Sequence, residues 1–231
     1  MSTPILSVSN LRKAYGRGEA AFEALKGIDL EIAEGESIAI IGKSGSGKST
    51  LMHLLALLDK PTSGSIALSG VNTSTLRGSA LNHTRNATFG FVFQQFFLNA
   101  SASVLENVIL PLKIAGVGRR ERKRRGMEAL TQLELDDKAR SRASTLSGGQ
   151  KQRAVIARAL VNNPRVIFAD EPTGNLDTAT GAVVEDILFG LNRELGITLI
   201  VVTHDEELAA KCTRQVTLRD GVVISDERRA S

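Results

Sequence analysis

Residues 42–49 read Gly42-Lys43-Ser44-Gly45-Ser46-Gly47-Lys48-Ser49, and this stretch decides the fold. Residues 37–41 before it are mostly apolar, and residues 51–55 after it are rich in leucine. This order predicts a strand, a glycine-rich turn and a helix, the setting in which G-x-x-x-x-G-K-[ST] binds phosphate. Glycines let successive backbone N–H groups converge on a phosphate, and the helix start adds its positive dipole end. We therefore expect a nucleoside triphosphate at this loop.

Each residue type in this loop, called the P-loop below, has an expected task. Lys48 is expected to reach the β- and γ-phosphates, and Ser49 to offer its hydroxyl to Mg²⁺. The remaining phosphate contacts are expected from Gly42, Ser44, Gly45, Gly47 and Thr50. The alternative is an ordinary Gly/Ser loop that matches the pattern by chance, and the flanking strand and helix patterns argue against it.

The composition is that of a globular protein. The chain has 231 residues, 42% of them hydrophobic and 23% charged, which suits one domain with a sizeable core. No run approaches the roughly 18 consecutive apolar residues of a membrane span, so we expect no transmembrane segment. The single cysteine, Cys212, excludes an internal disulfide. With no tryptophan and one tyrosine, a broad base-stacking surface for single-stranded nucleic acid is not expected.

Strand and helix patterns divide the chain into parts. Alternating residues and intervening glycines predict an antiparallel sheet that leads into the P-loop strand, with strands at 5–8, 22–25, 28–32 and 36–41. Residues 65–68 and 89–93 are further strand candidates, and residues 103–162 change to a helical period. Strands and helices then alternate from 166 to 218, which predicts a parallel sheet with crossover helices.

We therefore expect one α/β domain over residues 1–231. Residues 1–93 and 163–231 are expected to form its core together with the N-terminal antiparallel β subdomain. Residues 94–162 are expected to form an inserted α-helical subdomain.

A basic run occupies residues 119–125, where six of seven residues are Arg or Lys. One interpretation is contact with anionic lipid headgroups, an acidic partner or nucleic acid. The other is a solvated helix start, which we favour because Met127 and Leu130 continue a helical pattern behind the run.

A second motif is an apolar strand that ends in two acids, Asp170 and Glu171. In P-loop proteins an Asp at this place holds Mg²⁺ at the carboxyl end of the strand beside the P-loop. Adjacent residues of an extended chain point to opposite sides, which leaves Glu171 free to accept a proton from an attacking water. The alternative is an acid pair that caps the turn before Pro172, and the upstream P-loop argues against it.

A third motif, Leu146-Ser147-Gly148-Gly149-Gln150, opens a predicted helix over 150–160 and provides a second anion site. This LSGGQ sequence, placed between a P-loop and an acid pair, resembles the nucleotide-binding subunit of ABC transporters, and the resemblance extends from Ile5 to about Ser225. It implies a P-loop NTPase (RecA-like) core, ATP and Mg²⁺ as ligands, and ATP hydrolysis.

The resemblance also implies roles for residues outside the P-loop. Tyr15 matches the aromatic residue that stacks on adenine, with a partly buried edge-strand aromatic as the alternative. Gln94 matches the glutamine that contacts Mg²⁺ and the attacking water, and its neighbour Gln95 stays open as a register alternative. His204 follows a strand and matches the histidine that contacts the γ-phosphate and orients Glu171.

A head-to-tail homodimer is a further implication. Ser147, Gly148, Gly149 and Gln150 match the signature that closes on nucleotide held by the other copy. Asp177 ends the Asn175-Leu176-Asp177 loop, which crosses the dimer interface in the family. Each P-loop would then be completed by the signature of the second chain.

Two phrases, residues 90–96 and 169–177, resemble the MacB-like and LolD-like branch of the family, which includes FtsE-like subunits. That branch implies a permease partner with few transmembrane helices and a large extracytoplasmic domain, and a position on the cytoplasmic face of the membrane. Residues 97–100 depart from the common pattern where such subunits meet the permease, so the partner's identity, the substrate and the transport direction stay open. Two alternatives are a soluble ABC-type ATPase acting on nucleic acid, which the missing second cassette disfavours, and a regulatory ATP-dependent dimerisation module.

Overall fold

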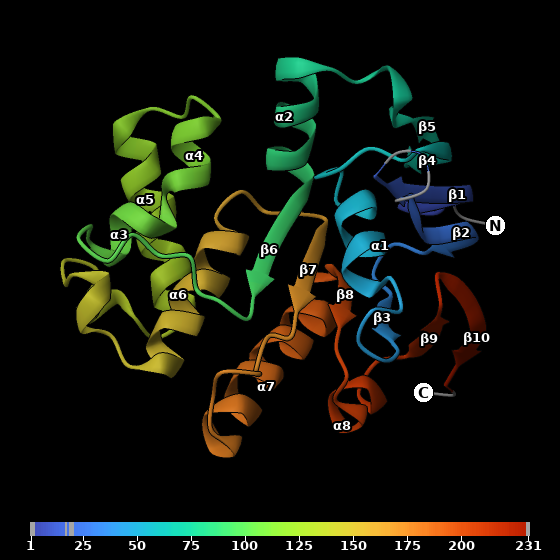
Figure 1. Cartoon of the computed structure of the whole chain (residues 1–231). Coiled ribbons are helices and arrows are strands. Elements are labelled where there is room, and N and C mark those ends of the chain that lie inside the picture. The colour runs from blue at the N-terminus through green and yellow to red at the C-terminus, as the bar shows by residue number, and fades with distance from the viewer. Residues whose placement is uncertain (1–2, 17, 19–20, 230–231) are drawn as a thin grey trace.

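The computed structural model describes residues 3–16, 18 and 21–229. Two sheets form the body of the molecule, and a layer of helices extends from one side of it (Figure 1). This arrangement confirms the expected α/β class with an antiparallel β subdomain and a helical part.

The larger sheet has the strand order β10-β9-β3-β8-β7-β6. Its neighbouring strands are parallel except for the β9–β10 hairpin. In sequence order they are β3 (Ser37–Ile41), β6 (Phe89–Phe93), β7 (Val166–Asp170), β8 (Thr198–Val202), β9 (Arg214–Arg219) and β10 (Val222–Arg228). β8 is buried along its whole length, as expected for a parallel strand covered on both faces.

The smaller sheet is antiparallel, with the order β2-β1-β4-β5. Its strands are β1 (Leu6–Tyr15), β2 (Phe22–Ile32), β4 (Ser63–Leu68) and β5 (Val71–Asn72). The predicted break between strands at 22–25 and 28–32 is wrong, because β2 is continuous. Gly27 has a φ of +92° beside a register shift, so the glycine marks an irregularity within the strand and not its end. The strand predicted at 36–41 belongs to the larger sheet.

Two apolar cores lie on opposite faces of the larger sheet. Ile38 and Ile40 of β3 pack in one core with the buried side of α1 (Lys48–Leu55) and the smaller sheet. Ala39, between them, belongs to the other core, with α6 (Gly148–Leu160) and α7 (Thr178–Leu195). This division follows from the two-residue period of a strand.

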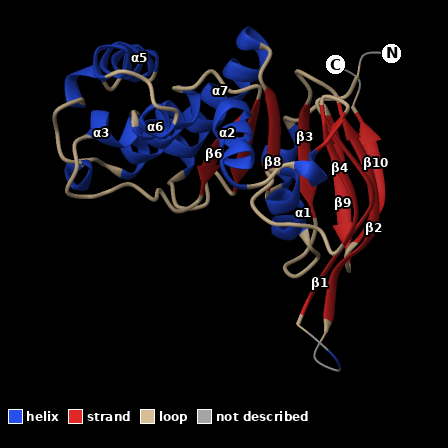
Figure 2. Cartoon of the chain, turned by 90° about the horizontal axis from the view of Figure 1, so that it is seen from above, coloured by secondary structure: helices blue, strands red, loops and turns tan. Residues whose placement is uncertain are grey.

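The remaining helices are short or peripheral (Figure 2). They are α2 (Gly78–Thr88), α3 (Val104–Val108), α4 (Leu110–Ile114), α5 (Arg119–Gln132) and α8 (Glu206–Ala210), with 3-10 turns at Thr73–Thr75, Asp136–Lys138 and Ala143–Thr145. We did not predict α2, and it has no buried residue to give an apolar period. Among the described residues, no helix is long and apolar enough to cross a membrane.

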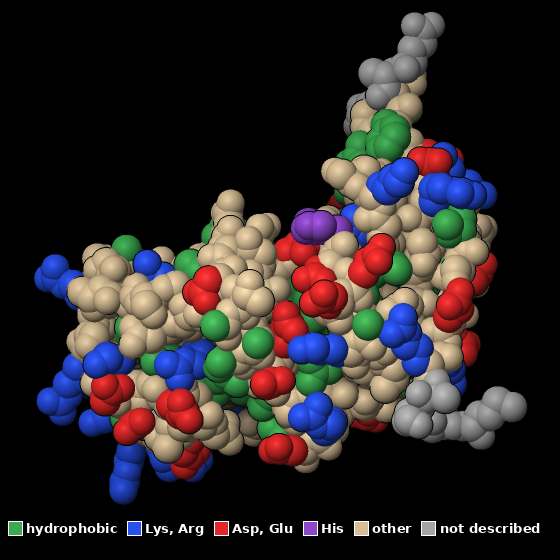
Figure 3. Space-filling model, turned by 90° about the horizontal axis from the view of Figure 1, so that it is seen from below, with side chains coloured by type: hydrophobic (Ala, Val, Ile, Leu, Met, Phe, Trp, Pro, Cys, Tyr) green, Lys and Arg blue, Asp and Glu red, His purple; other side chains and the backbone are tan. Residues whose placement is uncertain are grey.

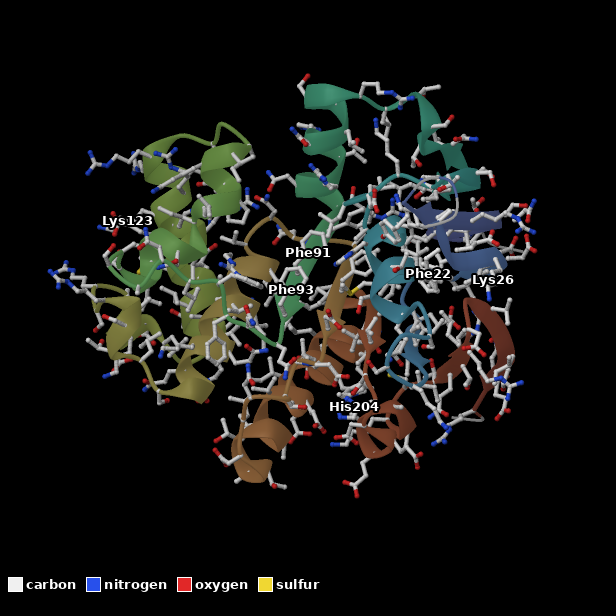
Figure 4. The ribbon with its side chains drawn as sticks, viewed as in Figure 1. Phe22, Lys26, Phe91, Phe93, Lys123 and His204 are labelled. Atoms are coloured by element: carbon white, nitrogen blue, oxygen red, sulfur yellow. The ribbon has the colours of Figure 1, made fainter. Side chains whose placement is uncertain are left out.

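The basic run forms the first half of α5, which confirms the predicted helix start. Arg124 pairs with Glu121 and with Glu128, whose carboxylate oxygen lies 2.6 Å from the guanidinium. Leu130, on the opposite side of the helix, is fully buried. Lys123 extends outward from α5 (Figure 4), so the run is a charged outer surface on a helix anchored by its apolar side.

Candidate functional site

The motifs converge at the carboxyl ends of the parallel strands. The P-loop follows β3, the acid pair ends β7, His204 follows β8, and Gln94 follows β6. All four strand ends lie at the lower edge of the sheet in Figure 1, where ligands bind in open α/β sheets.

Two positions in the P-loop accept only glycine. A Cβ atom on Gly42, whose φ is +149°, would lie 2.2 Å from the Leu218 carbonyl oxygen. A Cβ on Gly47, whose φ is +102°, would lie 2.8 Å from the Ala24 carbonyl oxygen. Gly47 is also the N-cap of α1 and provides no side-chain cap. The helix therefore begins with backbone N–H groups that are available to an anion.

Lys48 lies across the P-loop. Its Nζ donates to the carbonyl oxygens of Gly42 and Lys43, at 2.7 and 3.1 Å. The Oγ of Ser46 is buried and has no hydrogen-bond partner among the described residues. A cationic centre, a glycine cradle and an unpaired buried hydroxyl fit a phosphate chain.

Asp170 and Glu171 differ in environment although they are adjacent. Burial raises the pKa of Asp170, and the negative charge of Glu171 raises it further, while His53 and Lys48 oppose the shift. Asp170 ends β7 in extended backbone, whereas Glu171 has a φ of +45°. The left-handed residue turns the chain, so the Glu171 side chain takes a direction that a regular strand would not give it.

Three donors hold the Glu171 carboxylate. Oε2 accepts from Thr203 Oγ1 at 2.9 Å, and Oε1 accepts from the His204 backbone N–H at 2.9 Å. Oε1 also lies 2.6 Å from His204 Nδ1. Since an ionised carboxylate only accepts, Nδ1 carries the proton of this contact. The Glu171 side chain is 19% exposed and that of His204 is 79% exposed, so the histidine shields the acid and is itself exposed to solvent.

Gln94 faces the loop after the acid pair. Its Nε2 lies 3.5 Å from Asn175 Oδ1, and the backbone carbonyl oxygen of Gln94 accepts from Asn175 Nδ2 at 2.8 Å. A Cβ on Gly174 would lie 2.7 Å from Gln94 Nε2. The side chain of Gln94 is therefore packed against the segment that follows Glu171.

The signature loop, residues Leu146–Gln150, forms a closed cap. Ser147 Oγ accepts from the Gln150 backbone N–H at 3.3 Å, and Gln150 Oε1 accepts from the Ser147 backbone N–H at 3.0 Å. A Cβ on Gly149 would lie 2.4 Å from Thr180 Cγ2. The two glycines of this loop therefore lie close to the start of α7.

Asp177 caps that start. Its Oδ1 accepts from the Thr180 backbone N–H at 3.0 Å and its Oδ2 from the Thr180 hydroxyl at 2.7 Å. These bonds, the backbone one first, hold the pKa of Asp177 below its usual value. A cavity of about 590 Å³ lies between this cap and the signature loop. Among the described residues, those lining it include none from the P-loop, so one chain keeps its two anion sites apart.

Tyr15 stands at the end of β1, 42% exposed. Its hydroxyl donates to Asp59 Oδ2 at 3.2 Å, and Lys13 Nζ lies 4.9 Å from the ring centroid. Burial tends to raise the pKa of Asp59, but Lys13 and the Lys60 backbone N–H outweigh it and the pKa is lowered. One face of the ring is therefore covered by a lysine, while much of the ring stays accessible.

Residues 25–174 match the family described as ABC transporter. The chain belongs to the ABC transporter family.

Relatives of this cassette include proteins of about its own length and longer ones. It is 48% identical over 229 residues to the macrolide export ATP-binding/permease protein MacB 1 of Aeromonas hydrophila, covering 99% of this chain and 35% of that protein. It is 46% identical over 222 residues to the lipoprotein-releasing system ATP-binding protein LolD of Geobacter metallireducens, covering 96% of this chain and 99% of that protein. The cassette thus spans about a third of the MacB relative.

A solved dimer of an ATP-binding cassette, in a post-hydrolysis state bound to ADP and Pi, has the same fold. It superposes with a TM-score of 0.88 at 42% identity, covering 98% of this chain and 100% of that chain. The resemblance drawn from the P-loop, the acid pair and the signature loop is confirmed, and the chain is an ABC ATPase cassette.

Two residues of this ABC cassette escaped the sequence analysis. Thr203 is fully buried and donates a hydrogen bond to Glu171. In the sequence, only its position between a strand and His204 pointed to this role. Gln152 is also fully buried, and its Nε2 donates to the Pro172 carbonyl oxygen at 2.6 Å. Its signal was a polar residue on the apolar side of the signature helix. Gln152 joins α6 to the loop that follows the acid pair.

Proposed function

We propose that this cassette binds and hydrolyses MgATP at a composite site formed by two copies arranged head to tail, and so powers a permease of the MacB or LolD type. The observation that carries the proposal is the separation, within one chain, of the P-loop from the cavity beside the signature loop. The relative solved as a dimer with ADP and Pi supports it.

ATP would be held mainly by backbone and lysine. The phosphate contacts are assigned to Gly42, Ser44, Gly45, Gly47, Lys48, Ser49 and Thr50. Tyr15 would stack on the base with the ring area that Lys13 leaves free. Mg²⁺, for which Ser49, Gln94 and Asp170 supply oxygen ligands directly or through water, would neutralise charge on the phosphates.

Glu171 is the proposed base for the attacking water. The hydrogen bonds from Thr203 and His204 fix both carboxylate oxygens, so the carboxylate is preorganised. Because His204 Nδ1 faces Glu171, Nε2 is the ring atom left to meet a γ-phosphate. Gln94, packed against Gly174, would place the water and report occupancy of the site to the helical part.

The second copy would complete the site with Ser147, Gly148, Gly149 and Gln150, and Asp177 would lie at the interface. Loss of the γ-phosphate would remove the ligand that both copies share, and the dimer would open. We propose that residues 94–162 move as a helical subdomain against a core made of residues 1–93 and 163–231.

The permease would be an integral membrane protein with few transmembrane helices and a large extracytoplasmic domain, and the cassette would then lie on the cytoplasmic face of the membrane. A hollow of about 510 Å³ between β6, α2 and α4 supports such docking, and its lining includes Phe91, Phe93, Leu110, Pro111 and Ile114. Phe91 and Phe93 lie on β6 beside the helical layer (Figure 4). An apolar segment of a partner fits this lining.

The test is Glu171→Gln, measured by steady-state ATP hydrolysis and by analytical ultracentrifugation. We expect turnover to fall by about 100-fold or more because the base is lost, while an ATP-bound dimer accumulates. Glu194→Gln, which changes an exposed carboxylate near the end of α7, is the matched control. Unchanged turnover in Glu171→Gln would contradict the assignment.

A further inference from the structure

The β1–β2 hairpin carries two exposed aromatic residues side by side. Tyr15 and Phe22 are cross-strand partners, and Phe22 is 61% exposed. Cross-strand partners lie on the same face of a sheet. In Figure 2 the ends of β1 and β2 project beyond the rest of the molecule, and Figure 3 shows hydrophobic side chains gathered where the hairpin projects.

That face is turned toward the P-loop. Lys13 and Leu25 form another cross-strand pair, separated from the Tyr15–Phe22 pair by a register shift. Lys13 Nζ lies over the Tyr15 ring, so these two side chains of β1 share a face. Leu25 Cδ2 lies 2.8 Å from the Cβ position of Gly47. The β2 strand is fixed there, because the Lys26 N–H donates to the Gly221 carbonyl oxygen at 2.9 Å and the Gly221 N–H donates to the Ser46 carbonyl oxygen at 3.0 Å.

Phe22 therefore stands at the nucleoside end of the site. It is three residues from Leu25, and a strand advances about 3.3 Å per residue, so it lies on the order of 10 Å beyond the P-loop contact. A nucleotide whose phosphates lie in the P-loop and whose base stacks on Tyr15, as proposed above, would bring that base beside Phe22, the cross-strand partner of Tyr15. Phe22 has no polar atom, so contact with an apolar ligand surface stabilises it more than contact with water does.

We propose that Phe22 is a second aromatic contact for the nucleoside half of bound ATP, and that Tyr15 and Phe22 together favour purine over pyrimidine nucleotides. Because stacking tolerates base identity and depends on ring area, the pair discriminates by size and not between adenine and guanine. The inference rests on the proposed function, since it requires nucleotide phosphates in the P-loop.

Calorimetric binding of ATP, CTP and inorganic tripolyphosphate tests this. For Phe22→Ala we expect ATP affinity to fall about 5- to 10-fold, CTP affinity to fall less, and tripolyphosphate affinity to stay unchanged. Phe22→Tyr should restore ATP binding. Val71→Ala, which removes an equally exposed apolar side chain from β5, should change none of the three.

Unchanged ATP affinity in Phe22→Ala overturns the inference. An equal loss for ATP and tripolyphosphate overturns it as well, because the residue would then act on the fold of the P-loop. A failure of the proposed function would give a different result. Lys48→Ala would then bind tripolyphosphate as tightly as the parent does, whatever the effect of Phe22→Ala.

Discussion

The starts of α1 and α6 each present backbone N–H groups to an anion, but they are capped in opposite ways. α1 begins after Gly47, in the left-handed region, with no side-chain cap. α6 begins after Ser147, whose hydroxyl and N–H are both paired with Gln150. At the P-loop the chain also leaves Ser46 Oγ buried and without a partner among the described residues.

This difference indicates that the two helix starts have different roles in nucleotide binding. The uncapped start of α1 has unsatisfied donors that a phosphate can occupy, so the P-loop should bind nucleotide in a single chain. The capping box makes α6 stable without a ligand, so the signature loop should add affinity only when another copy brings it a phosphate. The next three predictions test this contrast, from the largest expected effect to the smallest.

Lys48→Ala should abolish most nucleotide binding by the single chain. The ammonium that lies across the P-loop is lost, and charge-assisted contacts to phosphate are worth about 1.5–3 kcal/mol, so ATP affinity should fall by about 10- to 100-fold. Isothermal titration calorimetry gives the affinity. Lys43→Ala, in which an exposed lysine of the same loop is removed, should bind ATP within about 3-fold of the parent.

Tight ATP binding by Lys48→Ala would contradict the assignment of the P-loop as the site that binds the nucleotide phosphates.

Ser147→Ala should separate dimerisation from binding. The variant loses the α6 cap, at a cost of about 1 kcal/mol in stability, and its single chain should bind ATP with parental affinity. ATP-dependent dimerisation, followed by light scattering on the Glu171→Gln background, should weaken by about 100-fold, because one hydrogen bond to phosphate is lost at each of the two composite sites. Thr145→Ala, just before the loop, is the control.

If Ser147→Ala weakened ATP binding by the single chain as much as dimerisation, the contrast between the two helix starts would be wrong.

Asp226→Asn should change stability and leave both helix starts unaffected. Arg214 donates to both Asp226 oxygens at 2.6 Å and joins β10 to β9, the hairpin that backs the P-loop. The hydrogen bond from Arg214 holds the pKa of Asp226 below its usual value. The carboxylate therefore stabilises the fold at pH values above its unfolded pKa, about 4, and loses this effect as pH falls through its folded pKa.

At pH 7 the free energy of unfolding of the variant should be about 1 kcal/mol lower than that of the parent. The difference is small because Asp226 is partly exposed. The difference from the parent should begin to shrink below about pH 4 and vanish below the folded pKa of Asp226, as measured by chemical denaturation. A difference that persisted at low pH would point to packing and not to the charge of Asp226.

The sequence predicted where the motifs lie in the fold better than it predicted the edges of the fold. The P-loop, the acid pair and the signature loop are continuous motifs, and each sits at a strand end or helix start that its own residues specify. β2 was divided at Gly27 because a glycine inside a strand looks like a turn until the register with β1 is known. α2 was missed because a helix without buried residues has no apolar period.

Contacts between distant segments could not be predicted from the sequence for another reason. Thr203 and Glu171 are 32 residues apart, and only the pairing of β7 with β8 brings them together. The left-handed backbone of Glu171 has no signature in its residue type. The Gln152 contact with Pro172 likewise depends on how α6 packs against the sheet.

The central claim is that ATP joins the P-loop of one copy to the signature loop of another. On the Glu171→Gln background, chains carrying Lys48→Ala and chains carrying Ser147→Arg should each stay monomeric with ATP. Mixed, they form one intact composite site, so analytical ultracentrifugation should show an ATP-dependent heterodimer. ATP-dependent dimers of Ser147→Arg alone, or no dimer in the mixture, would contradict the claim.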